Sequence, residues 1–136
     1  MLDTLKNHAD NLNSLLELEG EEGQFEYLIE VGKKAAPLTE QDRVDKNKMS
    51  GCLAQVWIKY YKKGDKNYFL GDSDALIVKG LVIIISEALS GLTDDQIKEL
   101  KHDMVDELGL GPSLSARRQV GMMAMVDHIK IITGVK

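Results

Sequence analysis

The sequence predicts an α+β fold in which a small central antiparallel sheet of about three strands is flanked by helices. Apolar residues recur at helical spacing at both ends of the chain, and strand-forming residues cluster in the middle around a hairpin turn. Strands grouped in the middle with helices at both ends imply an antiparallel sheet. The 136 residues suit one domain, and we expect a single domain over residues 1–136.

Two helices are expected at the N-terminal end. We expect Gly20 and Gly23 to break the first helix, and the helical spacing then resumes at Phe25. Pro37 stops the second helix, because proline disfavours the helical conformation of the residue before it. The first helix has five leucines on one side: Leu2, Leu5, Leu12, Leu15 and Leu16.

The middle of the chain predicts a hairpin. Residues Cys52–Tyr61 are rich in valine, isoleucine and aromatic residues, which favours a strand. Gly64 and Asp65 supply the turn, and a second strand begins at Tyr68 and ends at Gly71.

Residues 74–89 carry conflicting local signals. The run Leu81–Ile85 has the bulk of a strand, but the unbroken span is longer than a usual strand. We predict a helix buried on nearly all sides, capped by Asp72 or Ser73 and stopped by Gly91.

Two further helices complete the prediction. Thr93 and Gln96 form a capping box, so a short helix follows as far as about Leu108. Ser115 caps the last helix, which ends at Gly134. The apolar stripe of that helix consists of Met122, Met125, Val126, Ile129 and Ile132.

Composition argues against several classes of function. The 22 acidic and 17 basic residues give a formal charge of −5, which disfavours a nucleic-acid partner. The single cysteine, Cys52, rules out an intramolecular disulfide and a cysteine-rich zinc site, and the three histidines lack metal-ligand spacing. No apolar run approaches the roughly 20 residues of a membrane span, and the first residues lack the features of a secretory signal. We therefore expect a cytoplasmic protein without a membrane partner, because a lone thiol stays reduced in that compartment.

Cys52 is the strongest candidate for chemistry. It follows Gly51, which gives the loop freedom and allows a partner to approach closely. Its thiolate is the reactive form, and nearby positive charge favours it. The alternative is a buried, inert cysteine that packs as a small apolar residue.

Three other features give weaker signals of function than Cys52 does. Gly71–Asp74 resembles a cation-binding loop but lacks the further carboxylates of a calcium site, which favours a strand-to-helix turn. The Gly-x-Gly fragment at Gly109–Gly111 lacks the third glycine of a dinucleotide site and indicates a loop. Arg117 and Arg118 lie in the first turn of a helix, where positive charge is unfavourable. This placement indicates another role, the alternative being a pair of solvated arginines.

Four blocks of sequence form a recognisable pattern. They are Tyr27–Gly32, Asn47–Trp57 with its Gly-Cys-x-x-x-Val-Trp core, Gly71–Leu81 and Leu114–Met125. In this order they resemble the SufE family, the sulfur acceptors that act with cysteine desulfurases. Ala54 and Ala116 depart from the family pattern, where serine and proline are common.

The resemblance implies a SufE/IscU-like fold and makes Cys52 the sulfur carrier. A SufS-like cysteine desulfurase would use its own pyridoxal phosphate, so we expect no cofactor and no metal in this chain. Cys52 would take persulfide sulfur, stimulate the desulfurase and pass the sulfur to an iron–sulfur scaffold. The resemblance also implies that Ser50 and Gly51 belong to the Cys52 loop, that Asp74 lies near it, and that Arg118 reaches towards it.

A single thiol suits a persulfide carrier, because a second cysteine within reach would discharge the persulfide as a disulfide. Burial protects a persulfide but raises the pKa of a thiol, which disfavours transfer. We therefore hypothesise a loop with two states, held at rest by Asp74 and Arg118 and everted on the partner.

Other functions remain as alternatives. A regulatory module would dock on a desulfurase or another protein without carrying sulfur. A cysteine hydrolase needs a histidine base beside Cys52, and no histidine is placed there by the sequence. An iron–sulfur scaffold needs several thiolate ligands. A monomer and a homodimer are equally compatible with the pattern.

Overall fold

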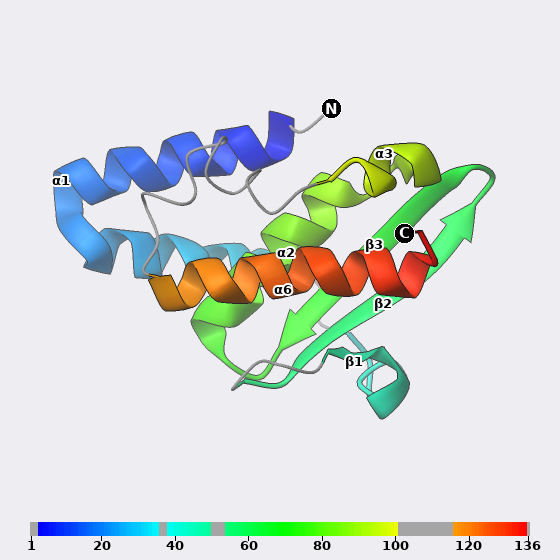
Figure 1. The fold of residues 1–136 in the computed structure, drawn as a ribbon. Coiled ribbons are helices and arrows are strands. Elements are labelled where there is room, and N and C mark those ends of the chain that lie inside the picture. The colour runs from blue at the N-terminus through cyan, green and yellow to red at the C-terminus, as the bar shows by residue number, and fades with distance from the viewer. Residues whose placement is uncertain (1–2, 36–37, 50–53, 101–115, 136) are drawn as a thin grey trace.

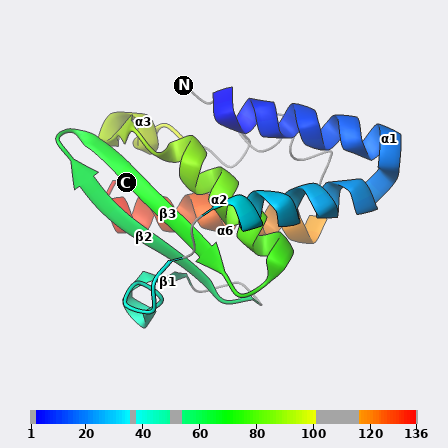
Figure 2. The same cartoon turned by 180° about the vertical axis from the view of Figure 1, so that it is seen from behind.

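The strands form one layer, and helices pack on one of its faces (Figure 1). The computed structural model describes residues 3–35, 38–49, 54–100 and 116–135. Helix α6 (Ala116–Thr133) crosses in front of the β-hairpin in Figure 1, and Figure 2 shows the opposite face with the strands in front. Helix α2 (Leu76–Leu89) packs against strand β3 (Lys66–Ser73), and helix α1 (Asp3–Lys34) packs along α2. The elements are α1 (Asp3–Lys34), a 3-10 turn (Asp45–Asn47), β1 (Lys48–Met49), β2 (Val56–Lys63), β3 (Lys66–Ser73), α2 (Leu76–Leu89), β4 (Leu92–Thr93), α3 (Asp94–Lys98) and α6 (Ala116–Thr133).

The sheet is antiparallel, with the strand order β1-β2-β3-β4. The predicted α+β class is confirmed, although the sheet has four strands because β1 and β4 contribute two residues each. The predicted hairpin turn is also confirmed. Lys63 pairs with Lys66 across Gly64 and Asp65, and Gly64 has a φ of 65°, which glycine adopts without strain.

The sequence predicted that the second strand ends at Gly71, and this prediction is wrong. β3 continues to Ser73, and Gly71 pairs with Ile58 of β2. A Cβ atom at Gly71 would lie 2.6 Å from Ser86 Oγ and 2.8 Å from a methyl group of Val82. The glycine therefore serves a close approach of α2 to the strand rather than a turn. β2 begins at Val56 rather than at Cys52, which lies outside the described residues.

Helix α1 consists of two arms joined at Gly20, where φ is 71° and ψ is −161°. The predicted break at Gly20 is confirmed, whereas Gly23 remains in the helix. The Gln24 amide donates to the Leu12 carbonyl across the bend at 3.0 Å. The second arm ends at Lys34, and the predicted stop at Pro37 lies outside the described residues.

Helix α2 is buried over most of its length, as predicted, from Gly80 to Ser86 and again at Ala88 and Leu89. The predicted cap is wrong. Ala75 occupies the N-cap position and makes no side-chain hydrogen bond there. The Asp72 carboxylate instead accepts from Leu38 and Arg43, and the Ser73 hydroxyl donates to the Gln55 carbonyl. Gly91 follows the helix with a φ of 91°, which confirms the predicted stop.

The C-terminal helices complete the core. The Thr93–Gln96 capping box is present, and α3 follows it. The predicted continuation to Leu108, the loop at Gly109–Gly111 and the cap at Ser115 lie outside the described residues. The predicted stripe of α6 is confirmed, since Met122, Met125, Val126 and Ile129 are buried and Ile132 packs against the core. Gly134, with a φ of 76°, follows the end of the helix.

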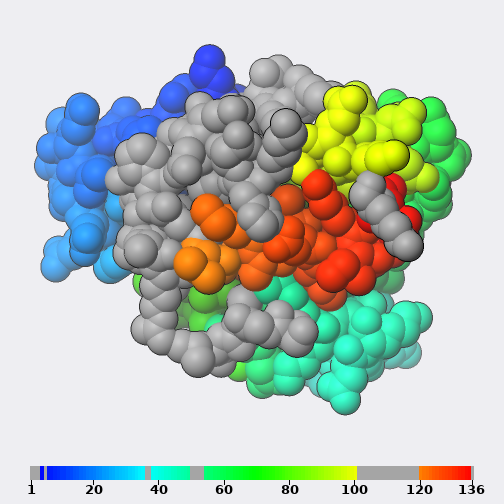
Figure 3. Space-filling model, viewed as in Figure 1, coloured from blue at the N-terminus to red at the C-terminus, as the bar shows by residue number. Residues whose placement is uncertain are grey.

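The surface of α6 is visible in Figure 3, between α3 and the β1–β2 part of the chain. None of the helices in the described ranges is long and apolar enough to cross a membrane.

Candidate functional site

The predicted cysteine loop is the connection between β1 and β2. Met49 pairs with Val56 at the last step of this ladder, so residues 50–55 form the connection. The candidate site residues Ser50, Gly51 and Cys52 lie outside the described residues. Met49 and Val56, which flank the connection, are both buried in the core.

Asp74 is hydrogen-bonded to the segment that follows Cys52. The Gln55 backbone N–H donates to Asp74 Oδ1 at 3.0 Å, and the Gln55 side-chain amide donates to Oδ2 at 3.1 Å. The Asp74 N–H donates in return to the Gln55 carbonyl at 3.3 Å. The Ser73 hydroxyl donates to the same carbonyl at 2.7 Å. These bonds, here called the Asp74–Gln55 contact, fix the chain three residues after Cys52.

Arg118 lies in the first turn of α6, where the backbone is described and the side chain is not. The structure therefore links one predicted site residue, Asp74, to the base of the cysteine loop. The roles of the other predicted residues stay predictions.

A buried carboxylate lies two residues before Asp74. Asp72 is fully buried, and its Oδ2 accepts from Arg43 Nε at 3.0 Å and from Arg43 Nη2 at 2.7 Å. The Leu38 N–H also donates to Oδ2, at 3.1 Å. Lys79 Nζ lies 3.6 Å from Oδ1. A buried charge with this many partners anchors the segment after α1 to the end of β3.

The environment of Asp72 sets its ionisation. Burial alone would raise the pKa of this carboxyl group. Hydrogen bonds from Arg43, Ser73 and Leu38 outweigh burial, so the pKa lies below its ordinary value and the group is a carboxylate at neutral pH.

Arg43 also connects this carboxylate to the strand that follows the cysteine loop. Its guanidinium carbon lies 5.3 Å from the centre of the Trp57 ring, a cation–π distance. Trp57 pairs with Lys48 on one side and with Asp72 on the other. This cluster could not be predicted from the sequence, because Arg43 and Asp72 are 29 residues apart and no local pattern joins them.

Two cavities lie next to the end of α1 and to α2. The β3-edge cavity has a volume of about 400 Å³ and lies between the segment after α1, β3 and α2. The His8 cavity, of about 270 Å³, lies between the arms of α1 and α2, and Ala35 and Glu87 line both cavities.

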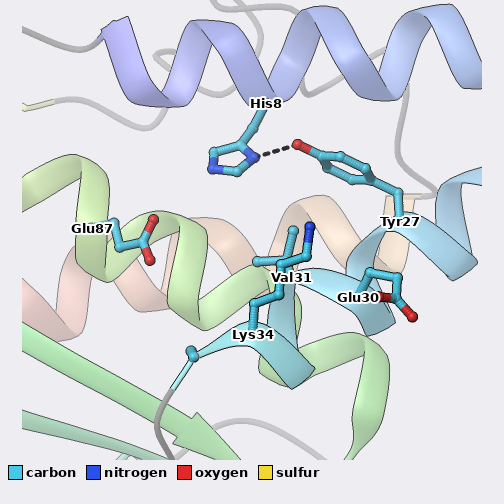
Figure 4. A pocket seen from close by; sticks show the side chains of 7 residues that line it. His8, Tyr27, Glu30, Val31, Lys34 and Glu87 are labelled. Atoms are coloured by element: carbon cyan, nitrogen blue, oxygen red, sulfur yellow. Dashed lines mark hydrogen bonds between the residues drawn. The ribbon is translucent and has the colours of Figure 1, made fainter.

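The His8 cavity is drawn in Figure 4. His8 Nδ1 lies 2.6 Å from the Tyr27 hydroxyl, which joins the two arms of α1. Burial lowers the pKa of His8, while the negative charge of Glu87 opposes the shift. In the described ranges, no group of three or more histidine, cysteine or acidic side chains is placed to hold a metal ion.

A comparison with known families identifies the chain. The model of the SufE domain, described as an Fe-S metabolism associated domain, matches residues 9–133. This chain belongs to the SufE family. SufE membership confirms the resemblance of the four sequence blocks and supports a role in iron–sulfur metabolism.

Individual relatives agree with the SufE assignment. An uncharacterized SufE-like protein of Rhizobium etli is 37% identical over 118 residues, which are 83% of this chain and 80% of that protein. An uncharacterized SufE-like protein of Synechocystis is 40% identical over 98 residues, which are 72% of this chain and 62% of that protein. The chain thus matches less than two thirds of the Synechocystis protein.

A solved structure of low sequence identity has a similar fold. The solution structure of a hypothetical protein from Thermus thermophilus has a TM-score of 0.64 and 20% identity, and the match covers 89% of this chain and 91% of that chain. At this identity the likeness supports the α+β fold alone.

Proposed function

We propose that this SufE-family protein accepts persulfide sulfur from a cysteine desulfurase on Cys52 and passes it to iron–sulfur cluster assembly. The observation that carries the proposal is the SufE family match over residues 9–133, which includes the only thiol in the chain. By accepting the sulfur, the protein would free the desulfurase for another turnover and so stimulate it.

The transfer is an exchange between sulfur atoms. The Cys52 thiolate attacks the outer sulfur of the desulfurase persulfide, and a new S–S bond forms as the donor S–S bond breaks. The desulfurase cysteine leaves as a thiolate, and Cys52 carries the sulfur as a persulfide. No external oxidant or reductant is needed, because one S–S bond replaces another.

The Asp74–Gln55 contact supports a role for Asp74 in this transfer. A contact three residues after Cys52 limits how far the loop can swing at rest. We propose that Gly51, next to Ser50 in the loop, supplies the conformational freedom for this change, while Asp74 and Arg118 favour the resting state. Engagement of the desulfurase would then shift the loop outwards.

The proposed reaction has consequences for partners and compartment. Pyridoxal phosphate belongs to the desulfurase, so the chain needs no cofactor of its own. A free thiolate has to persist between transfers, which suits the reducing cytoplasm. The proposed partners are the desulfurase and an iron–sulfur scaffold, with the protein acting as a monomer or a homodimer.

Intact-mass spectrometry without reductant tests the proposal. The protein is incubated with a cognate desulfurase and free cysteine, with Cys52→Ser as the matched variant. We expect the wild type to gain the mass of sulfur and the variant to gain none. Desulfurase turnover is measured in the same reactions, and we expect stimulation to be lost in the variant.

Two outcomes would overturn the proposal. One is an uncharged wild type in the presence of a charged desulfurase that binds it. The other is a Cys52→Ala variant that stimulates the desulfurase fully, which would assign the chain to a regulatory module without sulfur transfer.

A further inference from the structure

The edge of β3 that faces away from β2 is only partly covered. β4 pairs with Lys66 and Asn67 at this edge. Ser90 Oγ lies 3.0 Å from the Phe69 nitrogen and 3.2 Å from the Phe69 oxygen, so it occupies the place of a neighbouring strand. In an antiparallel pair every second residue directs both backbone groups to the same edge, so Gly71 directs its N–H and C=O there too. Within the described part of the chain, neither group of Gly71 has a hydrogen-bond partner.

The β3-edge cavity lies directly beside Gly71. Its volume of about 400 Å³ falls within the range of sites that bind ligands. Ser86 is also among the residues that line it. Its hydroxyl is buried and has no hydrogen-bond partner in the described part of the molecule. The apolar lining comes from Ala35, Leu38, Phe69, Leu70 and Ile83.

The charged residues of the cavity are acidic. Glu87 is exposed, and no ion pair is found for it within the described ranges. Asp42 is paired with Lys59 at 3.2 Å, so its charge is largely compensated. The unpaired carboxylate of Glu87 therefore determines the charge that an occupant meets.

We propose that an extended segment of a partner protein docks at the edge of β3. One residue of the segment exchanges backbone hydrogen bonds with the N–H and C=O of Gly71. The apolar side chain of this residue fills the β3-edge cavity, and a neighbouring lysine or arginine of the segment faces Glu87. The proposal commits to a peptide because a donor and an acceptor on one strand residue match those of a peptide backbone.

The position of this surface gives it a use. Ser73, the last residue of β3, and Asp74 follow Gly71 along the chain, and both bind Gln55. A partner segment at Gly71 would therefore lie at the end of β3 that leads to the Asp74–Gln55 contact. The docking itself does not depend on sulfur transfer, so the two proposals fail independently.

Titration of the ¹⁵N-labelled protein with a blocked peptide tests the docking. The probe is acetyl-Lys-Val-Lys amide, followed by NMR of the backbone amides. We expect saturable shifts of the Gly71 amide and of its neighbours in the cavity. Methylation of the valine nitrogen removes the donor to the Gly71 carbonyl, and we expect it to weaken binding by about tenfold.

Charge reversal at the rim provides the matched comparison. Glu87→Lys should weaken binding of the lysine peptide by about fivefold or more. Glu26→Lys, an exposed change on α1 that makes the same change in net charge, should leave binding unaltered. An unshifted Gly71 amide at millimolar peptide, or equal affinity of the methylated peptide, would overturn the proposal. Equally tight binding of free valinamide would also overturn it and assign the cavity to a small molecule.

Discussion

At the scale of single residues, the carboxylates of Asp72 and Asp74 have different tasks although they are two positions apart. Asp72 is buried and bound by Arg43, whereas Asp74 is exposed and bound to Gln55. The first joins distant segments of the fold, and the second holds the base of the proposed sulfur-carrying loop. Their substitutions should therefore affect different measurements.

Asp72→Asn should lower the free energy of unfolding by about 3 kcal/mol, because it leaves the partly buried guanidinium of Arg43 without its counterion. Chemical denaturation at neutral pH measures the loss. The exposed pair of Glu30 and Lys33 supplies the control, and Glu30→Gln should change stability by no more than about 0.5 kcal/mol. Equal effects of the two substitutions would contradict the assigned role of Asp72.

Lowering the pH should reduce the difference in the free energy of unfolding between the Asp72→Asn variant and the wild type. The pKa of Asp72 is lower in the folded protein than in the unfolded chain. Its contribution is therefore present above the ordinary carboxyl pKa and is lost as the pH falls through the folded value. A difference that stays constant down to strongly acidic pH would contradict this linkage.

Asp74→Ala should make Cys52 more reactive without a large loss of stability. The substitution removes two hydrogen bonds to Gln55 at the base of the loop. Alkylation of Cys52 should accelerate by about fivefold, measured at a pH where the thiol is fully ionised. Asp10→Ala, an exposed change on α1, is the control. An unchanged alkylation rate would show that Asp74 does not restrain the loop.

At the scale of elements, two glycines lie at the contact between α1 and α2, and only one of them is required for close approach. A Cβ atom at Gly80 would collide with the backbone carbonyl of Leu28. At Gly32 the nearest atom is a carbon of the flexible Lys79 side chain, at 3.3 Å. Both glycines are helical, so substitution by alanine gives each the same gain in helix propensity of about 1 kcal/mol.

Gly80→Ala should therefore destabilise the protein by about 2 kcal/mol or more, because the colliding atom belongs to the backbone of a packed helix. Gly32→Ala should be neutral or slightly stabilising, because Lys79 can move aside. Thermal denaturation of the two variants compares them directly. Equal stabilities of the two variants would contradict this prediction. They would mean that α1 and α2 can move apart at Gly80 without loss of free energy of unfolding.

The elements that the sequence predicted correctly depend on local signals. The bend at Gly20, the turn at Gly64 and the Thr93–Gln96 capping box each arise from residues within a few positions of one another. The prediction that Gly71 ends a strand was wrong because a glycine is needed there for the close approach of α2, a contact that exists only in the folded chain. The same holds for Asp72, whose chemistry suits a helix cap but whose main partner lies 29 residues away.

The candidate site also contains residues that the sequence predicts and residues that only the folded structure identifies. Cys52 could be selected from the sequence because it is the sole thiol, and Asp74 because of the family pattern. Arg43, Trp57 and the open edge at Gly71 could not, because long-range pairing brings them to this end of the sheet. The resemblance thus predicted the chemistry and the role of Asp74, while the structure shows that Asp74 is bonded to Gln55.

At the scale of the whole molecule, two half-buried histidines couple the packing of the helices to pH. His8 joins the arms of α1 through Tyr27, and His128 lies in α6 with an Nε2 that has no partner in the described part of the structure. Burial lowers the pKa of both groups. Each imidazole is therefore favoured in its neutral form by the folded state.

Stability should fall as the solution is acidified below neutral pH. The unfolded chain protonates its histidines near their ordinary pKa of about 6.5. The folded protein does so only at lower pH, so their stabilising contribution is complete above the unfolded value. It declines through the interval between the two values and levels off below the folded pKa.

Urea denaturation across this interval measures the slope of the free energy of unfolding against pH. The comparison is a double variant that combines His8→Gln with His128→Leu. The double variant should show a shallower slope, since the remaining carboxylates titrate at lower pH. An undiminished slope would assign the pH dependence to other groups and leave the two histidines with a packing role alone.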